Sequence, residues 1–377
     1  YKTFMLYLSR LKVNQSVNLD DFNDAYNQLE ISNSSIDNNN NNTITGTSAG
    51  LTAIAQENLT SSRAAVTLNN NGIINLSGRN STGMYAKFGI LNNNLTGTIT
   101  IGDSSTGLYG INDSEFSNTG KITIGNNSTG MYSENSTTAD LKNAGTIESA
   151  SSDSIAMLYK PATGMASGDM LINAGTGTIN MTGDKNVAMY GTEMGASASY
   201  GILNQGTITM GDSASISNPN VALYADGLNK LVENAGTITM GANTIGLYGR
   251  RAEVSAGTLT VGNAGIGVYS QGDNVDLTGG SITVGENQAV GVYTVGTGQT
   301  VTNAGTSLNI GNNSFGFVNL GQKDANGKFT IGSGNTVIST LASNALGKES
   351  IYIYSNDVTG TVANSTSLTS SGGQNYG

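Results

Sequence analysis

The chain has 377 residues, of which 52 are glycine, 2 are proline and none is cysteine, histidine or tryptophan. Its formal charge is −10 with only 16 lysines and arginines, which argues against nucleic acid or an anionic membrane as partner, because both attract clustered positive charge. Hydrophobic residues make up 37% and recur at regular spacing, so the composition indicates one repetitive all-β structure rather than a disordered chain.

The first part of the chain lacks the repeat that follows it. We expect residues 1–42 to form a helical N-terminal cap and an Asn-rich loop at 38–42. A helix over residues 16–30 would present one apolar face, made of Leu19, Phe22, Tyr26 and Leu29. A second short helix is expected over residues 1–13. Such a cap would cover the open end of a sheet.

A repeated phrase fills the remainder, residues 43–377, after a degenerate first copy at 43–52. It has the form GTITIG followed by GLY. Clear copies begin at Gly97, Gly120, Gly206, Gly236, Gly257 and Gly280, and weaker ones at Gly72, Gly145, Gly177, Gly305 and Gly327. Repeats of about 25 residues with strand-like alternation predict a parallel β-solenoid (β-helix) of about eleven coils.

Each coil contains three short strand signals with period-two alternation. In the first strand the aliphatic residues should stack in one buried column, formed by Ile99, Ile122, Ile179, Ile208, Ile238, Leu259 and Ile282. In the second strand we expect the pairs Ile245/Leu247, Ile266/Val268 and Val290/Val292 to face inward. The third strand is followed by asparagines that suit turns, such as Asn118, Asn143, Asn234 and Asn303.

The last stretch, at residues 350–354, has the sequence SIYIY and is again typical of a strand. It has no obvious cap, so we interpret the repeat as truncated at this end. No apolar run approaches the roughly 20 residues of a membrane-spanning helix, and no signal peptide is recognisable.

The combined phrase NAGTITMG…GLYG, with its Asn-x-Gly turn at Asn234 and Gly236, resembles the passenger-domain repeat of type V autotransporter adhesins, in particular the large fusobacterial outer-membrane adhesins. The resemblance covers the chain from about residue 43. It implies a bacterial cell-surface segment that binds a protein or glycan receptor, and that contacts the membrane only through a translocator barrel outside this segment. It does not identify the receptor.

One tyrosine per coil follows a predicted core aliphatic, and alternation places it outside. The series is Tyr85, Tyr109, Tyr132, Tyr190, Tyr224, Tyr248, Tyr269 and Tyr293. Such a stripe could bind sugars or protein, or could stabilise the solenoid by cross-strand stacking. We favour the structural interpretation.

We do not expect an enzyme or a cofactor. Asp103, Asp184, Asp212 and Glu286 follow the turn glycine in different coils, and a repeated turn explains them more simply than the convergent carboxylates of a polysaccharide-cleaving enzyme. The calcium-binding nonapeptide repeat is absent, and we expect no metal site.

Three consecutive coils are longer than the others, and their surplus should leave the rod as loops. These insertions are expected on one face, which is often the binding face of a solenoid, although they can also be tolerated decoration. The candidate partner-binding residues are Lys160, Pro161, Met165, Met194, Tyr200, Pro219 and Asn220. The sequence thus predicts an adhesin passenger, with a purely structural stalk or filament spacer as the alternative.

Overall fold

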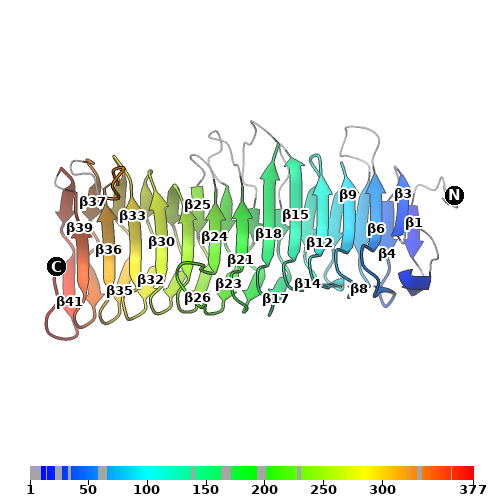
Figure 1. Cartoon of the computed structure of the whole chain (residues 1–377), viewed down its shortest axis with the longest axis horizontal. Helices are drawn as coiled ribbons and strands as arrows, with labels where there is room; N and C mark the ends of the chain where they lie inside the picture. The colour runs from blue at the N-terminus through cyan, green and yellow to red at the C-terminus, as the bar shows by residue number, and fades with distance from the viewer. Residues whose placement is uncertain are drawn as a thin grey trace.

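The chain is an elongated parallel β-solenoid (Figure 1). The computed structural model describes residues 10–13, 15–21, 28–32, 35–57, 66–136, 141–162, 171–192, 201–226, 231–321, 323–328, 333–357 and 359–377. Each coil contributes one strand to each of three sheets, except that the last coil has strands in two of them within the described residues, and successive strands of a sheet come from successive coils. No helix in these ranges is long and apolar enough to cross a membrane.

The three sheets, named A, B and C, follow each other along every coil. Sheet A consists of β1 (Arg10–Val13), β4 (Ser35–Asn38), β7 (Thr67–Asn70), β10 (Ile90–Asn93), β13 (Glu115–Asn118), β16 (Leu141–Asn143), β19 (Leu171–Asn173), β22 (Ile202–Asn204), β25 (Leu231–Asn234), β28 (Arg251–Val254), β31 (Val275–Leu277), β34 (Thr300–Asn303), β37 (Thr336–Ser339) and β40 (Thr361–Asn364). Sheet B consists of β2 (Val17–Asn18), β5 (Thr43–Gly46), β8 (Ile73–Leu76), β11 (Thr98–Ile101), β14 (Lys121–Ile124), β17 (Thr146–Ser149), β20 (Thr178–Met181), β23 (Thr207–Met210), β26 (Thr237–Met240), β29 (Thr258–Val261), β32 (Ser281–Val284), β35 (Ser307–Ile310), β38 (Ser343–Leu346) and β41 (Ser367–Ser370). Sheet C consists of β3 (Gln28–Ser32), β6 (Thr52–Glu57), β9 (Thr82–Lys87), β12 (Thr106–Ile111), β15 (Thr129–Ser136), β18 (Ile155–Pro161), β21 (Val187–Gly191), β24 (Val221–Ala225), β27 (Ile245–Gly249), β30 (Ile266–Gln271), β33 (Val290–Val295), β36 (Phe315–Leu320) and β39 (Ile351–Ser355).

The rod has more coils than the repeat phrase predicts, since sheets A and B each have 14 strands and sheet C has 13. The first coil, which begins at β1, and the last coils, at β38 and β41, escape detection because they lack the phrase. The copy expected at Gly327 is wrong, because Gly327 lies in a turn closed by Asp324 and sheet B continues at β38 instead. At about 4.8 Å per strand, the rod is about 60 Å long.

The expected N-terminal helices are not formed by the residues that the structure describes. Strands β1, β2 and β3 already belong to the three sheets, and the short 3-10 helix η1 (Leu19–Asp21) is the one helical turn in the described part of residues 1–42. Phe22 and Tyr26 lie outside the described residues. Strand pairing overrides the helical spacing here, because β2 finds a complete partner strand in β5, and Leu19 fills the end of the core.

The short helix η1 is held to the next coil by Asp20. Its carboxylate accepts hydrogen bonds from the backbone N–H of Thr47 at 2.6 Å and of Ser48 at 2.9 Å. Hydrogen bonds from Ser48 and Thr47 hold the pKa of Asp20 well below its usual value, because they favour the charged form. The first coil is thus fixed by polar contacts as well as strand pairing.

The predicted aliphatic column in sheet B is confirmed. Ile99 pairs with Ile122 and Leu259 with Ile282, and the chain of pairs between them is unbroken. Every member is fully buried. Stacking supplies each coil with the apolar contact that one coil cannot provide alone.

Asparagines at the ends of the sheet A strands are interior residues, not turn residues as expected. Asn38, Asn70, Asn93, Asn118, Asn143, Asn173, Asn204 and Asn234 are all fully buried. The amide nitrogen of each of the first seven donates to the amide oxygen of the next member at 2.7 or 2.8 Å. None has a left-handed backbone. The ladder satisfies polar groups that would otherwise be costly to bury.

Candidate binding surface

Sheet C carries two columns of side chains on its outer face, in which Val221, Ile245 and Val290 are at most 8% exposed. The first column starts with threonines and becomes aliphatic or aromatic: Thr82, Thr106, Thr129, Ile155, Val187, Val221, Ile245, Ile266, Val290 and Phe315. The second contains the tyrosines, three residues further along each strand. Val290, Val318 and Leu320 form an apolar cluster with Tyr293 and Phe315, separate from the core.

Of each pair that we expected to face inward, only the second residue belongs to the main core. Leu247, Val268 and Val292 are core residues. Ile245, Ile266 and Val290 lie outside this core, contrary to the prediction, although Ile245 and Val290 are buried, at 6% and 8% exposure. A Cβ on Gly246 would lie 2.5 Å from the Gly267 carbonyl oxygen and 2.9 Å from the Leu259 side chain. The glycine thus occupies an inward position with no room for a side chain. Two consecutive inward positions break the alternation and turn Ile245 outward.

The tyrosine ladder is confirmed as an outward column. Ring centroids of successive tyrosines are 4.6 to 5.5 Å apart, within the runs 85–132 and 190–293. Leu158 separates the two runs, and Val318 follows Tyr293. The rings bury one another on the sheet surface, which is the arrangement expected of stabilising cross-strand pairs.

Burial of the ladder also affects the phenol groups. The pKa of Tyr248 is raised to about 12, by burial first and then by the charges of Tyr224 and Tyr269. The pKa of Tyr132 is likewise raised to about 12, by burial and then by the carboxylate of Glu134. These hydroxyls are therefore protonated donors at neutral pH.

A groove opens on the outer face of sheet C beside the turn between β23 and β24. This turn runs from Gly211 to Asn220, whereas the same turn one coil later is only 241–244. The groove has a volume of about 360 Å³ and is lined by Lys185, Val187, Ser217, Asn218, Pro219, Val221, Tyr224, Ile245 and Tyr248. Its floor is the aliphatic column, one wall is the long turn, and the other wall is the tyrosine ladder.

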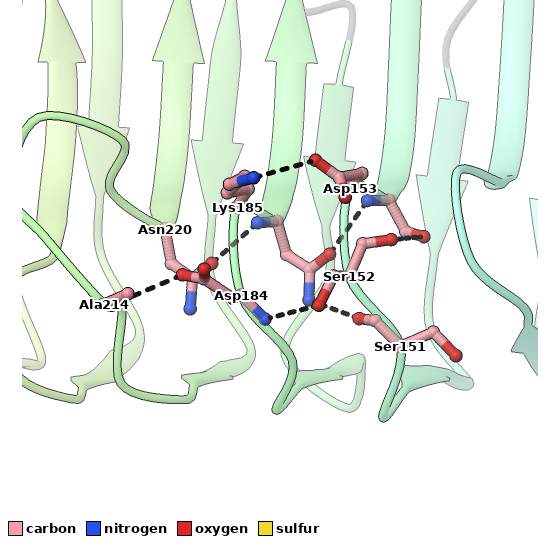
Figure 2. Close-up of polar contacts among 9 residues, drawn as sticks. Ser151, Ser152, Asp153, Asp184, Lys185, Ala214 and Asn220 are labelled. Atoms are coloured by element: carbon pink, nitrogen blue, oxygen red, sulfur yellow. Dashed lines mark hydrogen bonds and ion pairs between the residues drawn. The ribbon is translucent and has the colours of Figure 1, made fainter.

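The long turn is anchored at both ends (Figure 2). Asn220 is fully buried, and its amide nitrogen donates to the carbonyl oxygens of Gly183 and Gly211, each at 2.9 Å. Its amide oxygen accepts the backbone N–H of Asn186 at 2.6 Å. The Ala214 amide donates to the Asp184 carboxylate at 3.2 Å. The wall of the groove is therefore a fixed part of the solenoid.

The predicted partner-binding residues do not lie together in one site. Pro219 lines the groove. Asn220 is an interior anchor and is not available to a partner. Lys160 lies on the surface, 3.6 Å from Glu134 in an ion pair, and Pro161 is a buried residue at the end of β18 rather than in a loop. Met165, Met194 and Tyr200 lie outside the described residues.

We expected the insertions on one face of the solenoid, but they lie at different corners of the coil. The long turn at 211–220 joins sheet B to sheet C, whereas the segments after β18 and β21 join sheet C to sheet A. Four residues that line the groove were not predicted to bind a partner: Lys185, Val187, Val221 and Ile245. The change from threonine to valine or isoleucine at the start of the second predicted strand of each coil was the available signal.

The carboxylates weighed for catalysis take part in the turns. Asp103 accepts the backbone N–H of Asn126 at 2.9 Å, and Asp212 accepts that of Ala242 at 2.7 Å. Glu286 accepts the side-chain amide of Asn312 at 2.9 Å. Within the described ranges, no group of three or more acidic residues is arranged to hold a metal ion. Their positions fit turn stabilisation.

Comparisons of the chain with protein-family models, with curated proteins and with solved structures found no match. The geometry of the solenoid is therefore the basis for interpreting its function.

Proposed function

We propose that the chain is the passenger segment of a bacterial cell-surface adhesin and that it binds a receptor on host or bacterial cells. The observation that carries this proposal is the outer face of sheet C, where an apolar column and a tyrosine ladder lie next to a groove walled by an anchored turn. A groove with an apolar lining and a few polar groups is typical of binding sites. The resemblance of the repeat to autotransporter adhesins supports the same function.

A structural stalk is the alternative, and the regular stacking favours it. A spacer needs the buried column and the asparagine ladder, because these hold the rod together. It has no need for the long turn at 211–220 or for an aliphatic outer column. We infer that binding accounts for these features better, and we do not propose catalysis, a cofactor or a nucleic-acid partner.

The test is direct binding of the purified, fluorescently labelled chain to epithelial cells and to bacterial cells, measured by flow cytometry. An adhesin should bind one of these cell types saturably, and unlabelled chain should compete. A stalk should bind none. The segments after β18 and β21 can be tested in the same assay by trimming residues 163–169 and 193–199, which leaves buried Pro161 in place.

A further inference from the structure

The groove beside the turn 211–220 combines an apolar floor with a single charged residue among those that line it, Lys185. We propose that this groove binds a partner polypeptide at a segment where an aliphatic or aromatic side chain stands next to a carboxylate. The proposal rests on the adhesive function above and specifies the chemistry of its ligand.

The apolar part of the ligand is indicated by the floor. Val187, Val221 and Ile245 form adjacent levels of the outward column, and they line the groove together. The groove volume of about 360 Å³ is at the lower end of the roughly 300–1,000 Å³ typical of ligand pockets. This is room for a few side chains rather than a large ligand.

The tyrosine ladder changes geometry at the groove. Tyr190 and Tyr224 are stacked within 8° and Tyr248 and Tyr269 within 2°, but Tyr224 and Tyr248 meet at 86°. A partner side chain that enters beside this pair therefore contacts a ring edge as well as a ring face. Both phenol groups remain protonated and can donate hydrogen bonds to carbonyl or carboxylate oxygens.

The carboxylate of the ligand is indicated by Lys185. Its ammonium group lies 4.0 Å from the Asp153 carboxylate, and the two side chains are 51% and 49% exposed, so this ion pair is weak. The nearby carboxylates of Asp184 and Asp212 accept backbone N–H groups of the next coil. Lys185 therefore remains the charge that the groove offers to a partner.

The geometry favours a polypeptide over a glycan. Sugars stack on open aromatic faces, and the rings above and below the groove are covered by their stacked neighbours. The floor consists of aliphatic side chains, which reward apolar ligand groups. Preferential binding of an acidic glycan is therefore the competing outcome of the test.

The experiment measures binding of two fluorescent peptides by anisotropy, one containing Leu-Phe-Glu and the other Leu-Phe-Gln in the same neutral flanks. The native chain should bind the acidic peptide about threefold more tightly, because a carboxylate contact with a half-exposed lysine contributes less than about 1 kcal/mol. Lys185→Gln should remove this preference. Lys142→Gln, on the outer face of sheet A, is the matched control and should retain it.

A second variant tests the apolar floor. Val221→Thr with Ile245→Thr reproduces the threonines that the same column carries at Thr106 and Thr129, so the rod should still fold. It should weaken both peptides about tenfold or more, because apolar contact is lost from two adjacent levels. A melting curve close to that of the native chain confirms that the variant is folded.

Three results would overturn the inference: no binding of either peptide, equal binding by the native chain and both variants, or binding of sialyllactose in preference to the acidic peptide. The same variants in the cell assay separate the two proposals. If the native chain binds cells and the variants bind equally well, the groove inference fails while the adhesive function stands. If no cell type is bound although the groove selects the acidic peptide, the adhesive function fails alone.

Discussion

The coils from β9 to β15 and the coils from β21 to β27 have the same interior and different exteriors. In both regions the sheet B aliphatics are buried and the asparagine ladder is continuous. On the outer face of sheet C, threonines stand beside the tyrosines in the first region, whereas valines and isoleucine do so in the second. Only the second region has the long turn at 211–220.

The comparison separates two kinds of constraint. Interior residues contact their counterparts in the coils above and below, so one change disturbs three levels of the stack. Outer residues can vary without loss of the fold. An aliphatic outer column next to a long anchored turn is therefore informative about binding, whereas the interior is informative only about stability.

The largest expected effect is a loss of stability when the asparagine ladder is broken. It tests whether the interiors of the two regions are equivalent. Asn118→Ala and Asn204→Ala each remove a buried amide that bonds both ladder neighbours. Each should lower the free energy of unfolding by about 3 kcal/mol, because the neighbouring amides lose buried partners. Urea denaturation measures the loss. Asn92→Ala, on the outer face of β10, is the control and should cost about 0.5 kcal/mol. A much smaller loss at Asn204 than at Asn118 would show that the interiors differ.

The next effect concerns the turns between sheets B and C. Asn220→Ala removes the bonds to Gly183, Gly211 and Asn186 and should cost about 2 kcal/mol. At the corresponding position in the first region, Ser128 donates to the Gly102 carbonyl at 2.9 Å, and Ser128→Ala should cost about 1 kcal/mol. Only the Asn220 variant should also weaken peptide binding in the groove. Equal peptide binding by both variants would contradict the anchoring role of Asn220.

A smaller and equal effect is expected from the tyrosine ladder. Tyr109→Ala and Tyr269→Ala each remove a ring that contacts both neighbours, and each should cost about 1 kcal/mol. Differential scanning calorimetry measures both. A neutral Tyr269→Ala variant would mean that the second run of tyrosines does not stabilise the rod.

The smallest expected effect is a loss of stability in alkali. The pKa values of Tyr132 and Tyr248 are raised from 10.0 to about 12, so the folded chain holds these protons more tightly than the unfolded chain. Their stabilising contribution is complete below pH 10.0 and is lost as the pH rises toward 12. Urea midpoints on either side of pH 10.0 should show this decline, and Tyr132→Phe and Tyr248→Phe should each make it shallower. A midpoint that rises with pH would contradict the sign.

Much of the fold could be predicted because stacking repeats the same requirement in every coil. The period fixed the buried column from Ile99 to Ile282, and alternation placed the tyrosines outside. The N-terminal helices were wrong because the apolar spacing of residues 16–30 also suits strands, and pairing with β5 decides between them. The first coil and the last coils lack the phrase and were not counted.

The candidate site was predicted less well, because it depends on contacts between coils. Pro219 was identified, but Asn220 was interpreted as a surface residue and Lys185 was not considered. A turn inserted in one coil contacts residues of the coils on both sides, and these are far away in the sequence.

The sequence by itself determined that the chain is a parallel solenoid, since only stacked coils can bury one aliphatic column with this period. Tertiary structure decided which residues face outward in sheet C. Gly246 lies where the next coil's carbonyl approaches, and the small residues Ala188 and Ala222 are fully buried at the equivalent positions, so the residue before each of them lies on the outer face of the sheet. This arrangement moves Ile245 from the expected core to the floor of the groove, where it lies with Val187 and Val221.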